Sequence, residues 1–160
     1  MLNHPFPPLY TPHSKILILG SFPSVKSREQ CFFYGHPQNR FWKVLAYVLG
    51  GDIPQTIEEK KAILLEHGIA LWDVIASCEI TGSSDTSIKN VIPNDISEIL
   101  KTADIKQIFV NGKTAEKYYK KYLEEKTGKT AVCLPSTSPA NAAWSIDKLV
   151  SAWSVINEYM

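Results

Sequence analysis

The sequence predicts a three-layer α/β/α fold in which helices cover both faces of a central four-stranded parallel sheet. Two observations support this class: four short apolar runs alternate with longer amphipathic runs, and strands separated by helices pair in parallel through right-handed crossovers. The length of 160 residues suits one domain, which we expect to span residues 1–160. We expect the proline-rich opening, residues 1–14, to be an extended arm packed on that domain.

Each expected strand is a short apolar run that ends at residues typical of turns. The first, "KILILG", ends at Gly20, and the last, "TAVCLP", ends at a proline. The four expected strands cover residues 15–20, 69–75, 106–112 and 130–135.

The expected helices lie between these strands. The run "NRFWKVLAYVLG" is closed by Gly50 and Gly51, because glycine readily adopts the left-handed conformation that ends helices. Thr56 and Glu59 have the spacing of a capping box, which predicts a helix from about residue 56 to residue 67. Further helices are expected at residues 96–101, 113–125 and 140–159, and a polar loop at residues 77–95.

Composition and charge narrow the class of protein. Hydrophobic residues make up 44% and charged residues 21%, which is typical of a globular chain rather than a disordered one. The apolar runs are far shorter than the roughly 18 residues that span a bilayer, and a signal-peptide pattern is missing. We therefore expect a cytoplasmic protein, associated with the nucleoid if the cell is prokaryotic. Three widely separated cysteines indicate neither a disulfide framework nor a zinc site, and no metal or other cofactor is expected.

The net charge of +1 conceals an uneven distribution along the chain. Residues 1–43 and 101–130 each carry a net charge of +4, whereas residues 52–100 carry −6. A folded molecule could therefore present one basic side and one acidic side. This distribution permits a nucleic-acid partner without requiring one.

Polar residues collect where the expected strands end. The first strand runs into "GSFPS" (20–24), the second into Asp73, the third into Asn111 and the fourth into "LPSTSPAN" (134–141). Ligands of parallel sheets bind beyond the carboxyl ends of the strands, so these residues predict a site there. Aromatic side chains that could stack on a flat heterocycle follow the first strand, at Phe22, Phe32, Phe33 and Tyr34. Glycine-rich nucleotide-binding loops and the common hydrolase signatures are absent.

Three of these segments resemble, in order and spacing, the motifs of the uracil-DNA glycosylase superfamily. "LGSFPS" is similar to its first strand and G-x-x-P loop, "LPSTSPAN" to its second loop, and "HPQNRFWKVLA" to the segment between them. The resemblance covers roughly residues 5–155 and implies a uracil-DNA glycosylase-like α/β/α fold.

Differences from the known branches indicate where the chain belongs. Mismatch-specific members hold the attacking water with an asparagine at the position of Phe22, and classical uracil enzymes carry a histidine at the position of Leu134. The iron–sulfur branches need four cysteines, and this chain has three. Its motifs instead resemble the hypoxanthine-DNA glycosylase branch.

The resemblance implies that Asn39 is the catalytic residue. An amide is not a strong base, but it could orient a water molecule by accepting a hydrogen bond from it. Local sequence also favours Asn39 as the N-cap of a helix that begins at Arg40. Both roles remain open at this point.

A pocket for hypoxanthine should accept a hydrogen bond from N1–H and donate one to O6, since an unpaired buried polar group costs ~1–3 kcal/mol. Asp73 is the expected acceptor, although a turn or capping role is an alternative. Backbone N–H groups of Ser21 and Phe22 are the expected donors. Phe33, or else Phe32, is expected to stack on the base. The base-binding residues predicted in this way are Gly20, Ser21, Phe22, Pro23, Phe33 and Asp73.

Contacts to DNA are expected from two loops. "STSPAN" is expected to press into the minor groove, where an inserted side chain holds the flipped state open. Serine hydroxyls and nearby basic residues are expected to contact phosphates. The DNA-binding residues predicted in this way are Ser24, Lys26, Ser136, Thr137, Ser138 and Asn141, with Arg28 and Lys113 as possible supplementary charges.

These observations together predict a monofunctional, metal-independent DNA glycosylase that flips out hypoxanthine and hydrolyses its bond to deoxyribose. We expect a monomer that acts on double-stranded DNA, and single-stranded DNA is an alternative substrate. No lysine stands in the two loop motifs "LGSFPS" and "LPSTSPAN", so Schiff-base strand cleavage is not expected. A uracil or xanthine glycosylase and a lesion-binding module without catalysis remain alternatives.

Overall fold

The computed structural model describes residues 1–160 and has at its centre a four-stranded parallel sheet of order β3-β2-β6-β7. Its strands are β2 (Ile16–Gly20), β3 (Ile69–Asp73), β6 (Gln107–Asn111) and β7 (Ala131–Leu134). Every residue of β2 and β3 is buried, as expected for a parallel sheet covered on both faces. The predicted fold class and the four strands of the sheet are confirmed.

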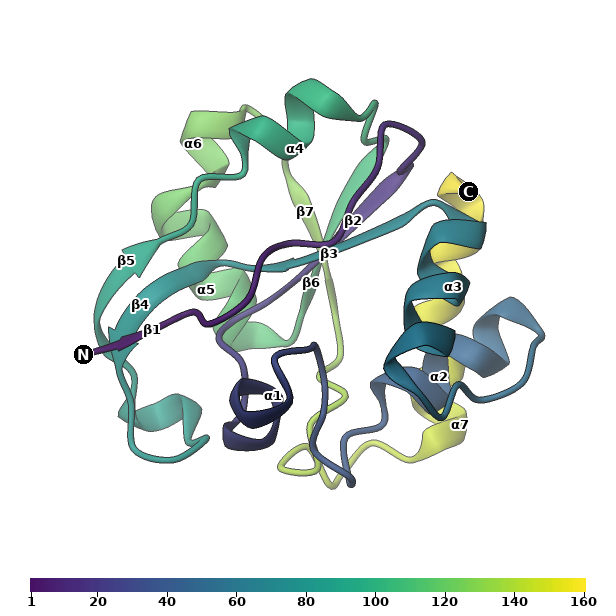
Figure 1. Cartoon of the computed structure of the whole chain (residues 1–160), viewed down its shortest axis with the longest axis horizontal. Helices are drawn as coiled ribbons and strands as arrows, with labels where there is room; N and C mark the ends of the chain where they lie inside the picture. The colour runs from purple at the N-terminus through teal and green to yellow at the C-terminus, as the bar shows by residue number, and fades with distance from the viewer.

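Helices form the two outer layers of the fold (Figure 1). On one side of the sheet lie α2 (Phe41–Leu49), α3 (Ile57–His67) and α7 (Ile146–Trp153). On the other side lie α4 (Ser97–Thr102), α5 (Lys113–Tyr122) and α6 (Glu124–Thr127), while α1 (Val25–Gln30) follows the end of β2. None of these helices is long and apolar enough to cross a bilayer.

The region after β3 differs from the prediction. The expected strand at residues 69–75 stops at Asp73, and the chain enters β4 (Ile75–Glu79) of a second, antiparallel sheet. The expected loop at residues 77–95 contains the end of β4, the 3₁₀ turn η1 (Asp85–Ser87) and strand β5 (Lys89–Pro93). Most side chains of β5 are exposed or half-buried, so the strand lacks the apolar run that would have predicted it.

The amino-terminal arm contacts both sheets. Strand β1 (Leu2–Asn3) pairs with β4, and Leu9 forms an antiparallel bridge with Leu71 at the edge of the parallel sheet. His4 and Phe6, which lie between these two pairings, pack edge to face with ring centres 4.5 Å apart. The arm thereby places a histidine beside the end of β3.

Two helices are shorter than predicted. The expected helix at residues 140–159 begins at Ile146, because the Ser145 hydroxyl accepts the Lys148 N–H, and it continues from Ser154 to Tyr159 as the 3₁₀ helix η2. The expected helix at residues 113–125 is interrupted at Leu123, between α5 and α6. Turns therefore occupy the residues just before α7, a region that contributes to the site.

Thr56 caps α3 as its spacing predicts, and its hydroxyl accepts the Glu59 N–H at 3.1 Å. The Glu59 carboxylate reaches the Gln55 N–H, not that of Thr56, so the reciprocal half of the capping box is displaced by one residue. We expect Thr56→Ala to lower the free energy of unfolding by about 1 kcal/mol, measured by denaturant titration. Thr130→Ala, at an exposed threonine, is the matched control. Equal stabilities of the two variants would contradict the cap.

Candidate active site

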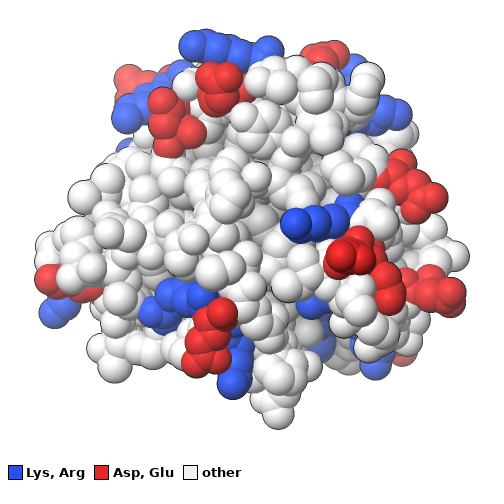
Figure 2. Space-filling model, in the orientation of Figure 1, with Lys and Arg blue, Asp and Glu red and all other residues white.

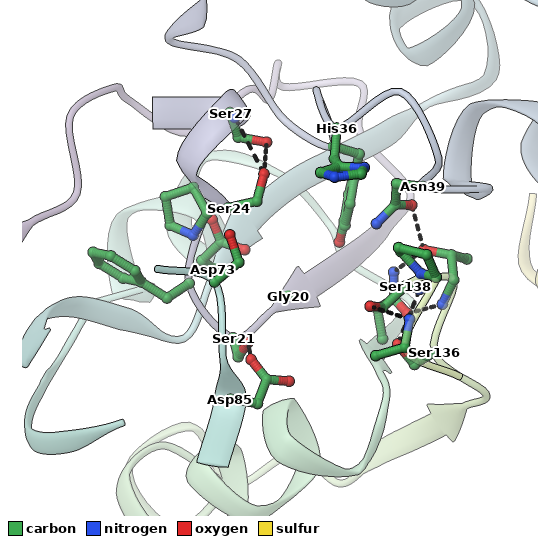
Figure 3. A pocket seen from close by; sticks show the side chains of 18 of the residues that line it. Gly20, Ser21, Ser24, Ser27, His36, Asn39, Asp73, Asp85, Ser136 and Ser138 are labelled. Carbon is green, nitrogen blue, oxygen red and sulfur yellow. Dashed lines mark hydrogen bonds between the residues drawn. The ribbon is translucent and has the colours of Figure 1, made fainter. Parts of the chain in front are cut away.

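A cavity of about 450 Å³ opens at the carboxyl ends of the parallel strands (Figure 3). The floor of the cavity is formed by residues at the ends of neighbouring strands. Gly20 at the end of β2 pairs with Asp73 at the end of β3, and Asn111 is the last residue of β6. The walls come from residues 20–24, 33–39, 83–86 and 136–140. Segments from the first forty residues, from the middle of the chain and from its last third therefore surround one cavity.

Asn39 lies on the wall of this cavity with a fixed orientation. Its side-chain oxygen Oδ1 accepts the Phe41 N–H at 2.9 Å and the Thr137 hydroxyl at 2.8 Å. A backbone N–H can only donate, so the atom that faces it must be the oxygen. The side-chain nitrogen Nδ2 is consequently the atom that points into the cavity (Figure 3).

This geometry bears on both roles considered for Asn39, the helix cap and the residue that orients water, and each role differs from the expectation. Helix α2 begins at Phe41, not Arg40. Asn39, two residues before the helix, accepts the hydrogen bond of the Phe41 N–H, which has no acceptor within the helix. Because two donors already occupy Oδ1, the expectation that this oxygen accepts a hydrogen bond from the attacking water does not fit. The groups that Asn39 offers to a ligand are the two N–H donors of its amide.

Asp73 offers the opposite kind of group. Its Oδ2 atom pairs with His4 Nε2 at 2.7 Å, and the two side chains are 5% and 3% exposed. A carboxylate only accepts, so His4 Nε2 carries the proton in this pair. The other oxygen, Oδ1, makes no hydrogen bond within the chain and belongs to the residue that lines the cavity. Asp73 is therefore a hydrogen-bond acceptor held in place by the amino-terminal arm.

Gly20 permits the close approach of Asp73. A Cβ atom at this position would lie 2.5 Å from Asp73 Oδ1 and 3.0 Å from the Tyr34 hydroxyl oxygen. Real Cβ atoms are not found so close to other atoms, so any larger residue would displace the carboxylate. Gly20, predicted as a base-binding residue, thus provides the space that the Asp73 carboxylate occupies.

Tyr34 packs its ring on Phe41, with ring centres 4.0 Å apart, and its hydroxyl group is buried. Burial raises the pKa of Tyr34 far above its ordinary value, and the nearby charge of Asp73 raises it further. The phenol stays neutral in the working range of proteins. It contributes a polar but uncharged group to the cavity wall.

The loop after β7 is shaped by its own hydroxyl groups. Ser136 Oγ accepts the Ser138 N–H at 3.1 Å, and Ser138 Oγ accepts the Ala140 N–H at 3.2 Å. The Asn141 side chain donates to the Ser136 carbonyl at 3.0 Å and does not line the cavity. These bonds stabilise the conformation of the loop without a ligand.

Arg40 holds the same loop from the other side. Its guanidinium donates to the carbonyl oxygens of Ser138 and Asn141, both at 3.0 Å, and to that of Trp144. Its backbone N–H also donates to the Thr137 carbonyl at 3.0 Å. Hydrogen bonds of Arg40 thus connect the segment that contains Asn39 to the loop after β7, which is expected to contact DNA.

Comparisons with known proteins agree with this architecture. A sequence model described as the uracil DNA glycosylase superfamily matches residues 7–157. The chain belongs to the uracil DNA glycosylase superfamily. It is 33% identical to a protein of Methanosarcina acetivorans named hypoxanthine DNA glycosylase, over 98% of each chain. It is 34% identical to a protein of the same name from Methanosarcina barkeri, over 74% of this chain and 76% of that one.

A solved structure supports the same assignment. The solution NMR structure of a candidate uracil DNA glycosylase from Methanosarcina acetivorans superposes with a TM-score of 0.81 at 30% identity, covering 98% of this chain and 99% of the other. The resemblance to the superfamily that the three motifs predicted is confirmed.

Most of the residues that the superfamily motifs implied surround the cavity. The predicted residues that line it are Asn39, Gly20, Ser21, Phe22, Pro23, Phe33, Asp73, Ser24, Ser136, Thr137 and Ser138. Lys26 and Asn141 do not line it. Lys26 instead forms an exposed ion pair with Glu29 at 3.5 Å, which does not prevent it from meeting a phosphate outside the cavity.

The structure also separates the two candidate stacking residues. Phe33 lines the cavity, whereas Phe32 stacks on Trp42 at a ring-centre distance of 6.0 Å and belongs to the core. Ser24, expected to contact a phosphate, caps α1 by accepting the Ser27 N–H at 3.2 Å. Its hydroxyl is therefore already engaged within the protein.

Sequence reasoning missed several residues of the site. His4 lies in an arm whose only visible signal is its prolines, and residues 83–86 reach the cavity from the hairpin between β4 and β5, a region that the sequence predicts to be a loop. The sequence places Asn111 at the end of a strand and assigns it no role in the site. No alternating pattern marks the hairpin, because β4 reads Ile-Ala-Ser-Cys-Glu and the side chains of β5 are exposed or half-buried.

One face of the molecule carries charges of both signs. On the face shown in Figure 2, Lys and Arg side chains are interspersed with Asp and Glu around a broad uncharged area. This face is therefore neither basic nor acidic as a whole. Backbone N–H and hydroxyl groups of the loops around the cavity therefore remain candidates for phosphate contacts beside the basic residues.

Proposed function

We propose that the protein is a monofunctional DNA glycosylase that turns a deaminated base, hypoxanthine first, out of duplex DNA and hydrolyses its bond to deoxyribose. It acts as a monomer, in the cytoplasm, and leaves an abasic site. The observation that carries the proposal is one cavity in which Asp73 offers an acceptor and Asn39 offers donors beside the aromatic wall of Phe33. Two relatives named hypoxanthine DNA glycosylase support the choice of base.

Deamination changes the edge of adenine in the way that this cavity can detect. Adenine presents an acceptor at N1 and an amino donor at C6, whereas hypoxanthine presents an N1–H donor and an O6 acceptor. Asp73 Oδ1 can accept the N1–H of hypoxanthine but finds no donor at N1 of adenine. An unpaired buried acceptor costs ~1–3 kcal/mol, so this contact selects the deaminated base.

The reaction adds water to C1′ of the sugar while the bond to N9 breaks and the electron pair leaves with the base. Negative charge develops on the departing base, and the N–H donors of Asn39 are fixed before the reaction begins. Fixed donors aimed at developing charge accelerate reactions more than mobile ones, because they need no reorganisation. The attacking water releases one proton to solvent and the departed base takes one up, so the products are the free base and a deoxyribose with a hydroxyl group at C1′.

Cleavage of defined duplexes tests this proposal. Duplexes with one deoxyinosine, deoxyuridine or deoxyxanthosine are incubated with excess protein, and abasic sites are broken with alkali. We expect fastest cleavage at deoxyinosine, and no adduct trapped by borohydride because no lysine lines the cavity. Breaks at uracil or xanthine alone would overturn the choice of hypoxanthine. Tight binding without breaks at any base would indicate a lesion-binding module.

A further inference from the structure

A chain of hydrogen bonds with one fixed direction runs behind Asn39. The Thr137 N–H donates to Asn111 Oδ1 at 3.1 Å, which identifies that atom as oxygen and leaves the Asn111 amide nitrogen as donor. Asn111 Nδ2 then donates to the Thr137 hydroxyl oxygen at 3.1 Å. The Thr137 hydroxyl must use its only proton to donate to Asn39 Oδ1, at 2.8 Å.

Both ends of this chain are anchored by backbone N–H groups, that of Thr137 and that of Phe41. A backbone N–H cannot reverse its role, so neither amide can turn over without losing a partner. Thr137 is 0% exposed, so its hydroxyl is shielded from bulk solvent. The chain joins the end of β6, the loop after β7 and the start of α2.

We infer that Thr137 and Asn111 are positioning residues that hold Asn39 with its amide N–H groups toward the base. This inference rests on the proposed function. Without the Thr137 hydroxyl, Asn39 Oδ1 keeps only the Phe41 N–H, and the broad amide torsion of asparagine is no longer restricted from both sides. The donors then spend less time where the charge of the leaving base develops. Thr137, expected from its motif to contact DNA, acts inside the protein.

A double-mutant cycle tests whether Thr137 acts through Asn39. Single-turnover excision of deoxyinosine is measured for wild type, Thr137→Val, Asn39→Ala and the double variant, well below their melting temperatures. Thr137→Val keeps the shape of threonine and is expected to lower the rate about 10- to 100-fold, as small misplacements of catalytic groups do. In the Asn39→Ala background the same change should lower the rate no further.

Two variants separate positioning from loss of stability. Thr137→Ser keeps the hydroxyl and is expected to restore the rate to within a few-fold of wild type. Thr56→Ala removes the cap of α3 at a residue that does not line the cavity, and it is expected to lower the melting temperature by a few degrees and leave the rate unchanged. A loss of activity that only reflected stability would appear in this control as well.

The orientation of Asn39 is also measurable without substrate. The Asn39 amide should give one sharp pair of ¹H–¹⁵N signals in wild type and broadened or doubled signals in Thr137→Val. Independent, additive effects in the cycle, or a Thr137→Val variant with the wild-type rate and unchanged Asn39 signals, would overturn the inference. If the wild type excises no base from any duplex, the proposed function fails, and the amide signals still decide whether Thr137 orients Asn39.

Discussion

Asn39→Asp is expected to lower the rate of hypoxanthine excision about 10²- to 10³-fold without unfolding the protein. Aspartate keeps an oxygen for the Phe41 N–H and the Thr137 hydroxyl, so the cap and the hydrogen-bond chain survive. It replaces the N–H donors that face the cavity with a second oxygen. That oxygen cannot donate to the departing base, and its charge opposes the negative charge that develops there. Single-turnover rates and melting temperatures measure the two effects separately.

Asn39→Ala is the companion variant, and it should lose both activity and stability. Alanine removes the donors and also the acceptor for two hydrogen bonds, which together contribute roughly 1–3 kcal/mol to the free energy of unfolding. A loss of stability in Asn39→Ala therefore does not argue against a catalytic role of Asn39. The decisive outcome is that of the aspartate variant: a rate equal to or above wild type would mean that Asn39 acts on the attacking water as an acceptor, and the donor role would be wrong.

Most of the parallel sheet was predictable because β2, β3 and the middle of β6 are buried on both faces. Burial of that kind requires continuous apolar runs, and "KILILG" and "KQIFVNG" are visible as such in the sequence. Strand β5 was not predictable, because its side chains lie largely at the surface and its pairing with β4 is stabilised by backbone hydrogen bonds. Backbone pairing leaves no trace in residue types.

The site was predictable to the extent that it follows the ends of strands. Asp73 and Gly20 are both strand-terminal, and parallel register brings such residues together. The direction in which Asn39 presents its amide was not predictable, because it depends on Thr137, which lies 98 residues away in the sequence. His4 was missed for the same reason: its partner, Asp73, is 69 residues distant.

Asp73→Asn is expected to lower the rate on deoxyinosine roughly 10- to 100-fold, which corresponds to ~1–3 kcal/mol for an unpaired polar group. In the wild type, His4 Nε2 donates to Asp73 Oδ2. An asparagine would keep its oxygen on His4, because moving the proton of the ring to Nδ1 would bury an N–H that has no acceptor. Its amide nitrogen would then face the cavity. Because this nitrogen and the N1–H of hypoxanthine are both donors, no hydrogen bond can form between them.

The same substitution should favour bases with an acceptor at that position, so the ratio of the hypoxanthine rate to the adenine rate is expected to fall. Matched duplexes with deoxyinosine or deoxyadenosine at one site measure this ratio, and a thermal melt shows that the variant is folded. Asp104→Asn is the control, since that carboxylate is 91% exposed and distant from the cavity residues. A variant that excises hypoxanthine at the wild-type rate would show that Asp73 supports the strand end and does not read the base.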